Sequence, residues 1–482
     1  MTQHLRRFGR ETFASFSYRN FRLFFAGQGV SQIGNWMTMV AQSLLVLSLT
    51  NSGIALGLLA VAQFGPVLVL GPWAGLVADR SDKRRLLIIV QTLAMVQSFL
   101  LAAVAFTGAP VWTIYAVAVF GGVTVAFDNP SRRAFVVEMV PTEDVPNAVS
   151  LNSALMTSSR VIGPALAGLL ITTAGYGWAF LLDGVSYIAV IVSFFMMRSS
   201  ELRPSPVASR TKGQIRDGFR YVRRMPELFV PLVMMGVVGT LAFNFNTVMP
   251  LFVTRDLHGT AGVFTILFSV VSIGSVVGAL VAARRKDVGV WNVGLASLGF
   301  GVAMGLLAIV PTLAWALPVA LVLGLCSITF LTMSTAIVQL RAAPEMRGRV
   351  LALQAMLFLG STPIGGPIVG WVAQTFGARW SLALGAVACL AAGAWGMAVV
   401  GRDDRGPALD AVLEQSDMDP ADLGTADLGT AGAPRADATR AGTTSGGTTS
   451  GGTAGADAGR FVDGPPSPSP SPSPASASAS AR

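Results

Sequence analysis

Residues 75–85 read GLVADRSDKRR, a short charged segment between two long apolar runs, 54–78 and 85–107. Each run has the length of about 20 residues that an α-helix needs to cross the hydrocarbon core of a bilayer. Charged side chains are costly inside that core, so a cluster of them marks the membrane surface. The segment therefore predicts a charged turn between two membrane-spanning helices.

The composition extends this interpretation to most of the chain. Of the 482 residues, 52% are hydrophobic and only 12% are charged, whereas soluble domains carry about 25% charged residues. The histidines (His4, His258) and cysteines (Cys326, Cys389) show no metal-ligand spacing. We therefore expect an integral membrane protein without a metal site or a cofactor. A membrane-embedded enzyme is disfavoured, because its spans would need His, Cys or paired acids.

Hydropathy predicts an all-α membrane fold with twelve transmembrane helices. Each predicted span has roughly the length that a bilayer requires. The expected spans are 22–49, 54–78, 85–107, 111–130, 147–173, 178–197, 228–253, 261–283, 289–310, 313–336, 348–374 and 379–400.

The basic residues indicate how these spans are oriented. The chain has a net charge of +9, and all but Arg160, Arg255 and Arg379 of its 34 lysines and arginines lie in the terminal segments or in alternate loops. Basic loops remain on the cytoplasmic side of a membrane. The sequence thus predicts a multi-pass protein of the cytoplasmic membrane with both termini in the cytoplasm. The same pattern explains the basic balance without a nucleic-acid partner.

The chain repeats internally at an offset of 202 residues. Identical residues recur at that offset in the first, fifth and sixth spans of each half: Gly34/Gly236, Thr38/Thr240, Gly163/Gly365, Gly175/Gly377 and Trp178/Trp380. One constant offset across three spans predicts two pseudo-symmetric six-helix bundles in parallel duplication.

The repeat and the composition together predict the domain organisation. We expect a cytoplasmic N-terminal arm (1–21), two six-helix bundles (22–197 and 228–400), a linker (198–227) and a tail (401–482). In the linker, apolar residues at helical spacing alternate with arginines, which is typical of a basic amphipathic helix on the membrane surface. The Gly/Ser/Thr runs and Ser-Pro alternation of the tail cannot bury a core, so we expect a disordered cytoplasmic tail.

A polar stripe follows one face of the first span. Because unsatisfied amides are costly in lipid, the stripe must face protein or water. It predicts the wall of a substrate cavity, and interhelical hydrogen bonding is the alternative. The stripe comprises Gln28, Gln32, Asn35, Met39 and Gln42, and the seventh span repeats part of it with Thr240, Asn244 and Thr247.

Charged residues in or beside the spans are further candidates. Asp79 and Lys83 have the spacing of a favourable pair on one helical turn, and Asp128 lies at the predicted end of the fourth span. Arg160, inside the fifth span, needs a carboxylate or carbonyl partner, or must reach the interface. Asp183, inside the sixth, is a candidate proton site, although a wet position near the helix end is the alternative.

Several segments resemble the major facilitator superfamily. Segment 75–85 resembles its loop motif between helices 2 and 3. Residues 160–168 resemble the Gly-Pro motif of its antiporters. Residues 16–24 and 34–37 are similar to the branch of bacterial siderophore (enterobactin-type) exporters and macrolide-efflux proteins, and the likeness covers about 13–400. The matching residues are Gly75, Asp79, Arg80, Lys83, Arg84 and Leu87 in the loop, and Arg160, Gly163, Pro164 and Gly168 in the Gly-Pro motif.

The resemblance implies a secondary active transporter that exports a small amphipathic organic compound by alternating access. It implies a conformational latch at the loop motif, completed by Asp128, and proton-coupled antiport as the default. Expected partners are the substrate, protons and membrane lipids, with the chain acting as a monomer. An uptake permease and a lysophospholipid flippase of the same fold remain open as alternatives.

Overall fold

The computed structural model describes residues 13–203, 214–285 and 288–400. This part of the chain is all-helical and belongs to one compact unit. Twelve of its segments are long and apolar enough to cross a membrane, as the hydropathy predicts. The predicted tail, most of the N-terminal arm and part of the linker lie outside the described residues.

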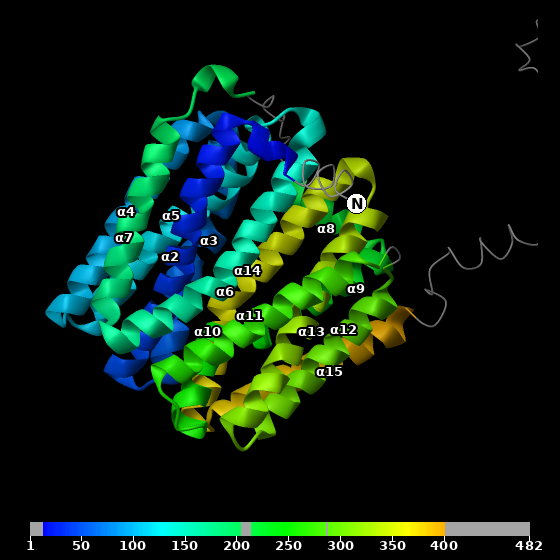
Figure 1. Cartoon of the computed structure of the whole chain (residues 1–482). Helices are drawn as coiled ribbons and strands as arrows, with labels where there is room; N and C mark the ends of the chain where they lie inside the picture. Colours follow the sequence, from blue (N-terminus) through cyan, green and yellow to red (C-terminus); the bar gives the residue numbers. More distant parts are fainter. Residues whose placement is uncertain (1–12, 204–213, 286–287, 401–482) are drawn as a thin grey trace, which may run out of the picture. The chain divides into compact units, whose positions relative to one another are not determined.

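The helices lie side by side in two sets (Figure 1). The first set comprises α2 (Arg19–Thr50), α3 (Gly53–Arg80), α4 (Lys83–Thr107), α5 (Val111–Glu138), α6 (Val145–Thr173) and α7 (Tyr176–Phe195). The second comprises α9 (Pro226–Leu241), α10 (Phe245–Leu251), α11 (Ala261–Ala283), α12 (Val290–Ile309), α13 (Leu313–Arg341), α14 (Pro344–Thr375) and α15 (Ala378–Val400). The short elements are η1 (Ala14–Ser17), η2 (Thr142–Asp144), η3 (Ser199–Glu201), α8 (Gln214–Arg223) and the π-helical turn η4 (Phe252–Asp256).

The packing repeats as the sequence does. In the first half α3 packs on α5 and α4 on α7, and in the second half α11 packs on α13 and α12 on α15. Gly175 and Gly377, which precede the last helix of each half, both have positive φ angles of 92° and 101°. Glycine adopts that conformation without steric cost. The repeated glycines therefore mark the same sharp turn in each half, and the predicted pseudo-symmetric fold is confirmed.

The spans connect at two ends of the helix sets. We call the end at which α2 begins the arm side and the opposite end, with turns at 51–52, 108–110 and 376–377, the far side. Five of the seven exposed tryptophans in the described residues lie close to the far-side ends of their helices, and aromatic belts are typical of a membrane interface. They are Trp112, Trp178, Trp315, Trp371 and Trp380.

The seventh span differs from the expected single helix over 228–253. Helix α9 ends at Leu241 and α10 begins at Phe245. At the break, the Asn244 side-chain Nδ2 donates a hydrogen bond of 2.7 Å to the Thr240 carbonyl. Interrupted helices are tolerated at membrane depth where they are buried in protein or line a cavity. The break is therefore expected to be buried in protein or to line a cavity.

Helix α5 is longer than expected, and its extra length contains a charged residue, Arg132. Hydropathy predicts the end of this span at residue 130, which would place Arg132 in a cytoplasmic loop. The structure continues α5 to Glu138, so Arg132 lies inside the helix and is 6% exposed. Its buried position requires a partner.

The linker helix α8 contacts protein on one face. The Tyr221 hydroxyl accepts a 3.1 Å hydrogen bond from the Ala343 amide just before α14, and Val222 is buried. Phe219 is exposed, with the Arg223 guanidinium 6.0 Å from its ring centre. The described part of α8 therefore has a buried side and an exposed side, and its contact with a membrane surface remains a prediction.

Candidate functional site

A cavity of about 420 Å³ lies between the two halves. Helices α2 to α7 supply one wall, and the other comes from the break in the seventh span with α10, α11, α13 and α14. Its volume falls in the range of about 300–1,000 Å³ that is typical of small-molecule sites. The cavity is therefore the candidate site.

The predicted polar stripe forms part of this wall. Gln32, Asn35, Met39 and Gln42 line the cavity, and Gln42 Oε1 accepts a 2.7 Å hydrogen bond from Gln63 Nε2 on α3. Gln28 is buried outside the lining, where its Oε1 accepts from Gln32 Nε2 at 3.3 Å. Helical spacing thus brings most of the stripe to the cavity wall, and its role in binding substrate remains a prediction.

The broken span supplies the facing wall. Five consecutive residues, 243–247, line the cavity, including Asn244 and Thr247 from the predicted echo of the stripe. Thr240 does not line it, because its hydroxyl donates to the Gly236 carbonyl at 2.6 Å within α9. Asn246 Nδ2 lies 3.2 Å from the Met39 sulfur, so the two halves touch here.

Buried polar atoms without a partner surround the cavity. Burying such an atom costs about 1–3 kcal/mol unless water or a ligand completes its hydrogen bonds. Their concentration at one site is typical of a place where a ligand binds. Within the described residues, these lining atoms are Gln42 Nε2, Gln91 Oε1, Arg160 Nε, Asp183 Oδ1, Asn244 Oδ1 and Asn246 Oδ1.

Asp183 is a buried carboxylate at the edge of this cavity. Its Oδ2 accepts hydrogen bonds from Thr38 at 2.7 Å and Ser98 at 2.8 Å, and the residue is 1% exposed. Gly34 makes room for it, because a Cβ there would collide with the carboxylate. Asp183 lies about 10 Å along α7 from its first residue. The structure therefore disfavours the wet helix-end position.

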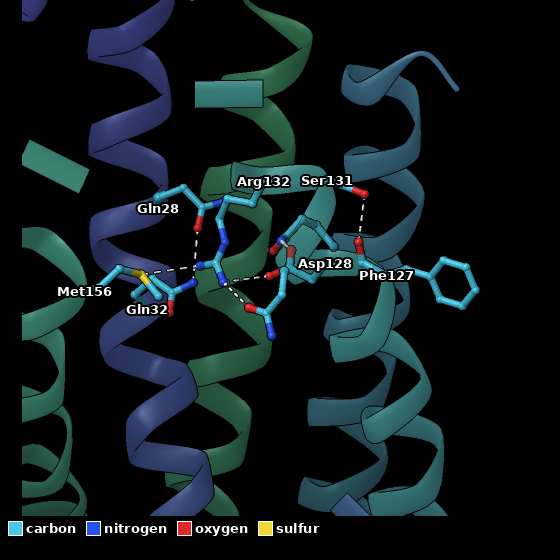
Figure 2. A network of polar contacts seen from close by, with 9 residues as sticks. Gln28, Gln32, Phe127, Asp128, Ser131, Arg132 and Met156 are labelled. Atoms are coloured by element: carbon cyan, nitrogen blue, oxygen red, sulfur yellow. Dashed lines mark hydrogen bonds and ion pairs between the residues drawn. The ribbon is translucent and has the colours of Figure 1, made fainter. Parts of the chain in front are cut away.

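Asp128 and Arg132 form the centre of a second polar network (Figure 2). The two side chains pair at 2.9 Å on α5, and Asp128 Oδ1 accepts a 2.7 Å hydrogen bond from Gln91 Nε2 on α4. Arg132 also reaches Asn129 at 3.1 Å and the Met156 sulfur of α6 at 3.5 Å. Hydropathy does not identify Arg132 as a site residue, because it predicts a loop at that position.

Arg160 lies on the same cavity wall without an acidic partner. Its guanidinium carbon is 4.8 Å from the centre of the Trp36 ring, which is the geometry of a cation–π contact. Among the described residues none forms an ion pair or a hydrogen bond with it. The expected carboxylate or carbonyl partner is therefore replaced by an aromatic face.

Close contacts between the halves gather on the far side. The Gly53 amide donates to Gln374 Oε1 at 2.8 Å, and the Arg255 guanidinium donates to the Asn51 carbonyl. A Cβ on Gly57 would lie only 2.7 Å from the Gly366 carbonyl oxygen. The far side of the cavity is thus sealed by backbone packing and hydrogen bonds between α3, α14 and their adjoining turns.

The sequence matches the transmembrane secretion effector family over residues 10–416. The chain belongs to this family of the major facilitator superfamily. Membership identifies it as a multi-pass membrane transporter of small molecules rather than an enzyme.

Characterised relatives are similar over most of their length. The staphyloferrin A transporter of Staphylococcus aureus is 26% identical over 366 residues, 74% of this chain and 90% of the relative. Macrolide efflux protein A of Streptococcus pyogenes is 23% identical over 387 residues, 78% of this chain and 96% of the relative. An enterobactin exporter of Shigella boydii is 22% identical over 357 residues, 73% of this chain and 84% of the relative.

Solved structures share the fold. A bacterial homologue of the human lysosomal transporter Spinster, in an inward-facing and unoccupied conformation, aligns with a TM-score of 0.64 at 14% identity, over 79% of this chain and 96% of that one. A D-xylose–proton symporter aligns with a TM-score of 0.63 at 13% identity, over 79% of this chain and 97% of that one. These likenesses confirm the major facilitator fold.

The loop motif of this transporter is arranged differently from the predicted latch. Helix α3 ends at Arg80 and α4 begins at Lys83, so Asp79 and Lys83 do not share a helical turn. Lys83 instead pairs with Glu138 at 2.7 Å. Asp128 belongs to the Arg132 network, ten residues before the end of α5. The expected cluster of Asp79, Lys83 and Asp128 is therefore not assembled.

Other motif residues hold the first half together. Arg84 donates to the carbonyls of Phe194 at 2.7 Å and Phe195 at 3.1 Å, at the C-terminal end of α7. An arginine there satisfies carbonyls that lack partners within the helix. Arg80 is exposed at the end of α3. A latch role for Gly75, Asp79 and Arg80 remains a prediction.

The Gly-Pro motif packs α6 against both halves. Gly163 faces α2, where an added Cβ would lie 2.5 Å from the Trp36 Cβ. Gly168 faces α11 of the second half, where a Cβ would lie 2.8 Å from the Thr265 Cβ. Pro164 is buried between them. Packing thus explains the two glycines, and Arg160 is the motif residue that remains available to the cavity.

Proposed function

We propose that this protein exports a small amphipathic organic compound across the cytoplasmic membrane by alternating access, in exchange for protons. The observation that carries the proposal is the cavity between the halves, whose wall holds buried polar atoms without partners and whose far side is sealed. Such atoms are satisfied when a ligand or water occupies the space.

Two further observations support export rather than uptake. The relatives include a siderophore exporter and a macrolide efflux protein. The arm side carries the basic turns, so the positive-inside rule assigns it to the cytoplasm. The sealed far side is then the external side, and this conformation is the one that receives substrate from the cytoplasm.

Asp183 is the proposed proton site. It is buried, it lines the cavity, and its Oδ1 has no partner among the described residues. Holding an unpaired carboxylate ionised inside a membrane protein is costly, so protonation during the transport cycle relieves that cost. At the 202-residue offset the second half has Gly385, so the acid belongs to one half alone.

Membrane vesicles of known orientation test this proposal. Everted vesicles that contain the full chain, acidified inside by respiration, should accumulate at least one of radiolabelled staphyloferrin A, enterobactin or erythromycin, and collapse of the proton gradient should release it. Vesicles without the protein are the control. Accumulation in right-side-out vesicles instead would indicate an uptake permease, movement of a fluorescent lysophospholipid alone would indicate a flippase, and no movement in either orientation would contradict transport.

A further inference from the structure

The two walls of the cavity differ in chemistry. Among the described residues that line the cavity, the charged side chains all come from the first half: Asp128, Arg132, Arg160 and Asp183. The described lining of the second half has no charged residue and combines uncharged polar side chains with an aromatic surface. Phe243 packs edge-to-face on Phe358 at 5.3 Å, and Phe245 and Phe268 complete that surface. A ligand that spans the cavity therefore meets charge on one side and aromatic rings on the other.

The four charged residues of the first wall are not all compensated by a neighbouring residue. Asp128 and Arg132 neutralise one another at 2.9 Å. Asp183 packs against Gly34, and its Oδ2 accepts hydrogen bonds from two hydroxyl groups. This oxygen therefore needs no cation as a partner. Arg160 remains, with no carboxylate within ion-pair distance among the described residues. A guanidinium cannot lose its charge at physiological pH, so its compensation must come from elsewhere.

Trp36 orients the Arg160 guanidinium without accepting hydrogen bonds from its N–H groups. The cation lies over the indole ring at 4.8 Å, so the N–H groups at the edge of its plane stay available. The Nε atom is buried and has no hydrogen-bond partner. A planar fork with free N–H groups matches a carboxylate or a similar oxyanion in bidentate geometry.

We propose that Arg160 is the anion-recognition residue of the cavity, and that the transported compounds are amphipathic anions whose acidic group binds Arg160 while an apolar or aromatic body contacts Phe243, Phe245 and Phe358. This inference rests on the proposed function and specifies its substrate class. It also assigns Trp36 as a positioning residue, because it holds the guanidinium toward the cavity and does not contact the anion.

A matched pair of fluorescent probes tests the assignment. Dansyl-phenylalanine carries a carboxylate, and its methyl ester has nearly the same shape without the charge. Purified full-length protein in detergent should bind the acid at least about tenfold more tightly than the ester, as expected for a charge-assisted contact. Arg160→Gln should lower the affinity for the acid to that for the ester and leave the ester unchanged. Arg160→Lys should keep part of the preference, because lysine retains the charge but lacks the fork.

Arg284→Gln is the matched control. It makes the same substitution at an exposed arginine just after the arm-side end of α11 that does not line the cavity, so the preference for the acid should persist. The size-exclusion profile and the melting temperature verify that each variant is folded. If Arg160→Gln does not fold, Arg160→Lys is compared with the wild type instead. Failure of wild type to bind the acid, equal affinity for acid and ester, or an unchanged preference in the Arg160 variants overturns the inference.

The result is separable from the proposed function. Binding that prefers the acid without any movement in vesicles contradicts export and leaves the anion site standing. Movement of acid and ester at equal rates supports transport and overturns the anion site.

Discussion

Asp183→Asn is expected to abolish proton-driven accumulation in everted vesicles, with a loss of at least about a hundredfold. Asparagine keeps the shape and can still accept hydrogen bonds from Thr38 and Ser98, but it cannot take up or release a proton. Exchange of labelled for unlabelled substrate across the membrane, which needs no net proton movement, should continue. Parallel assays of accumulation and exchange measure the two effects.

Asp82→Asn is the control for this substitution. Asp82 caps α4 on the exposed arm-side turn, where its carboxylate accepts from the Arg85 amide at 3.0 Å. Asparagine caps helices about as well as aspartate, so both activities should remain. Retained proton-driven accumulation in a well-folded Asp183→Asn protein would eliminate Asp183 as the coupling site.

Gly57→Val is expected to stop transport by preventing closure of the far side. An added Cβ would lie 2.7 Å from the Gly366 carbonyl oxygen and 2.8 Å from the Pro367 Cα, both in the backbone of the opposite half. Backbone in a packed helix cannot yield as a side chain does, so α3 and α14 must separate. The transport rate and the exposure of the cavity to the far side measure this effect.

Gly71→Val on the same helix is the matched control. An added Cβ at Gly71 would meet no atom within 4 Å, and both substitutions replace glycine with the same residue inside α3. Transport should therefore persist in Gly71→Val. Equal transport by the two variants would show that the far-side contact is not required for the cycle.

Hydropathy and the internal repeat predict the twelve spans and the two halves because both signals are local or strictly periodic. The break in the seventh span escaped that prediction. Its polar residue, Asn244, stands in an apolar run with no proline or charge at the break to mark an interruption. At the break the Asn244 side chain bonds to the Thr240 carbonyl, and hydropathy does not register such a contact.

The candidate site was predictable where several residues on one helix share a face. The stripe of α2 repeats with helical spacing, so its position in the wall follows from the sequence. Gln63 and Gln91 stand on α3 and α4 without a comparable stripe, and only their tertiary contacts place them at the cavity. Lys83 had several possible partners at the membrane surface, and the fold selects Glu138.

Gln42→Cys tests most directly whether the polar stripe lines a water-filled cavity that opens to one side of the membrane at a time. The substitution is made in a chain whose Cys326 and Cys389 are replaced, with Leu44→Cys as the control. Gln42 lines the cavity, whereas Leu44 is 3% exposed and packs in the hydrophobic core. A membrane-impermeant thiol reagent is applied to vesicles of each orientation.

We expect Gln42→Cys to react from the cytoplasmic side and to be protected by transported substrate. Adding Gly57→Val should make the same cysteine reactive from the external side, because the far-side seal is then open. Leu44→Cys should stay unreactive from both sides. Labelling of Leu44→Cys with an inert Gln42→Cys would contradict the cavity and, with it, the proposed transport path.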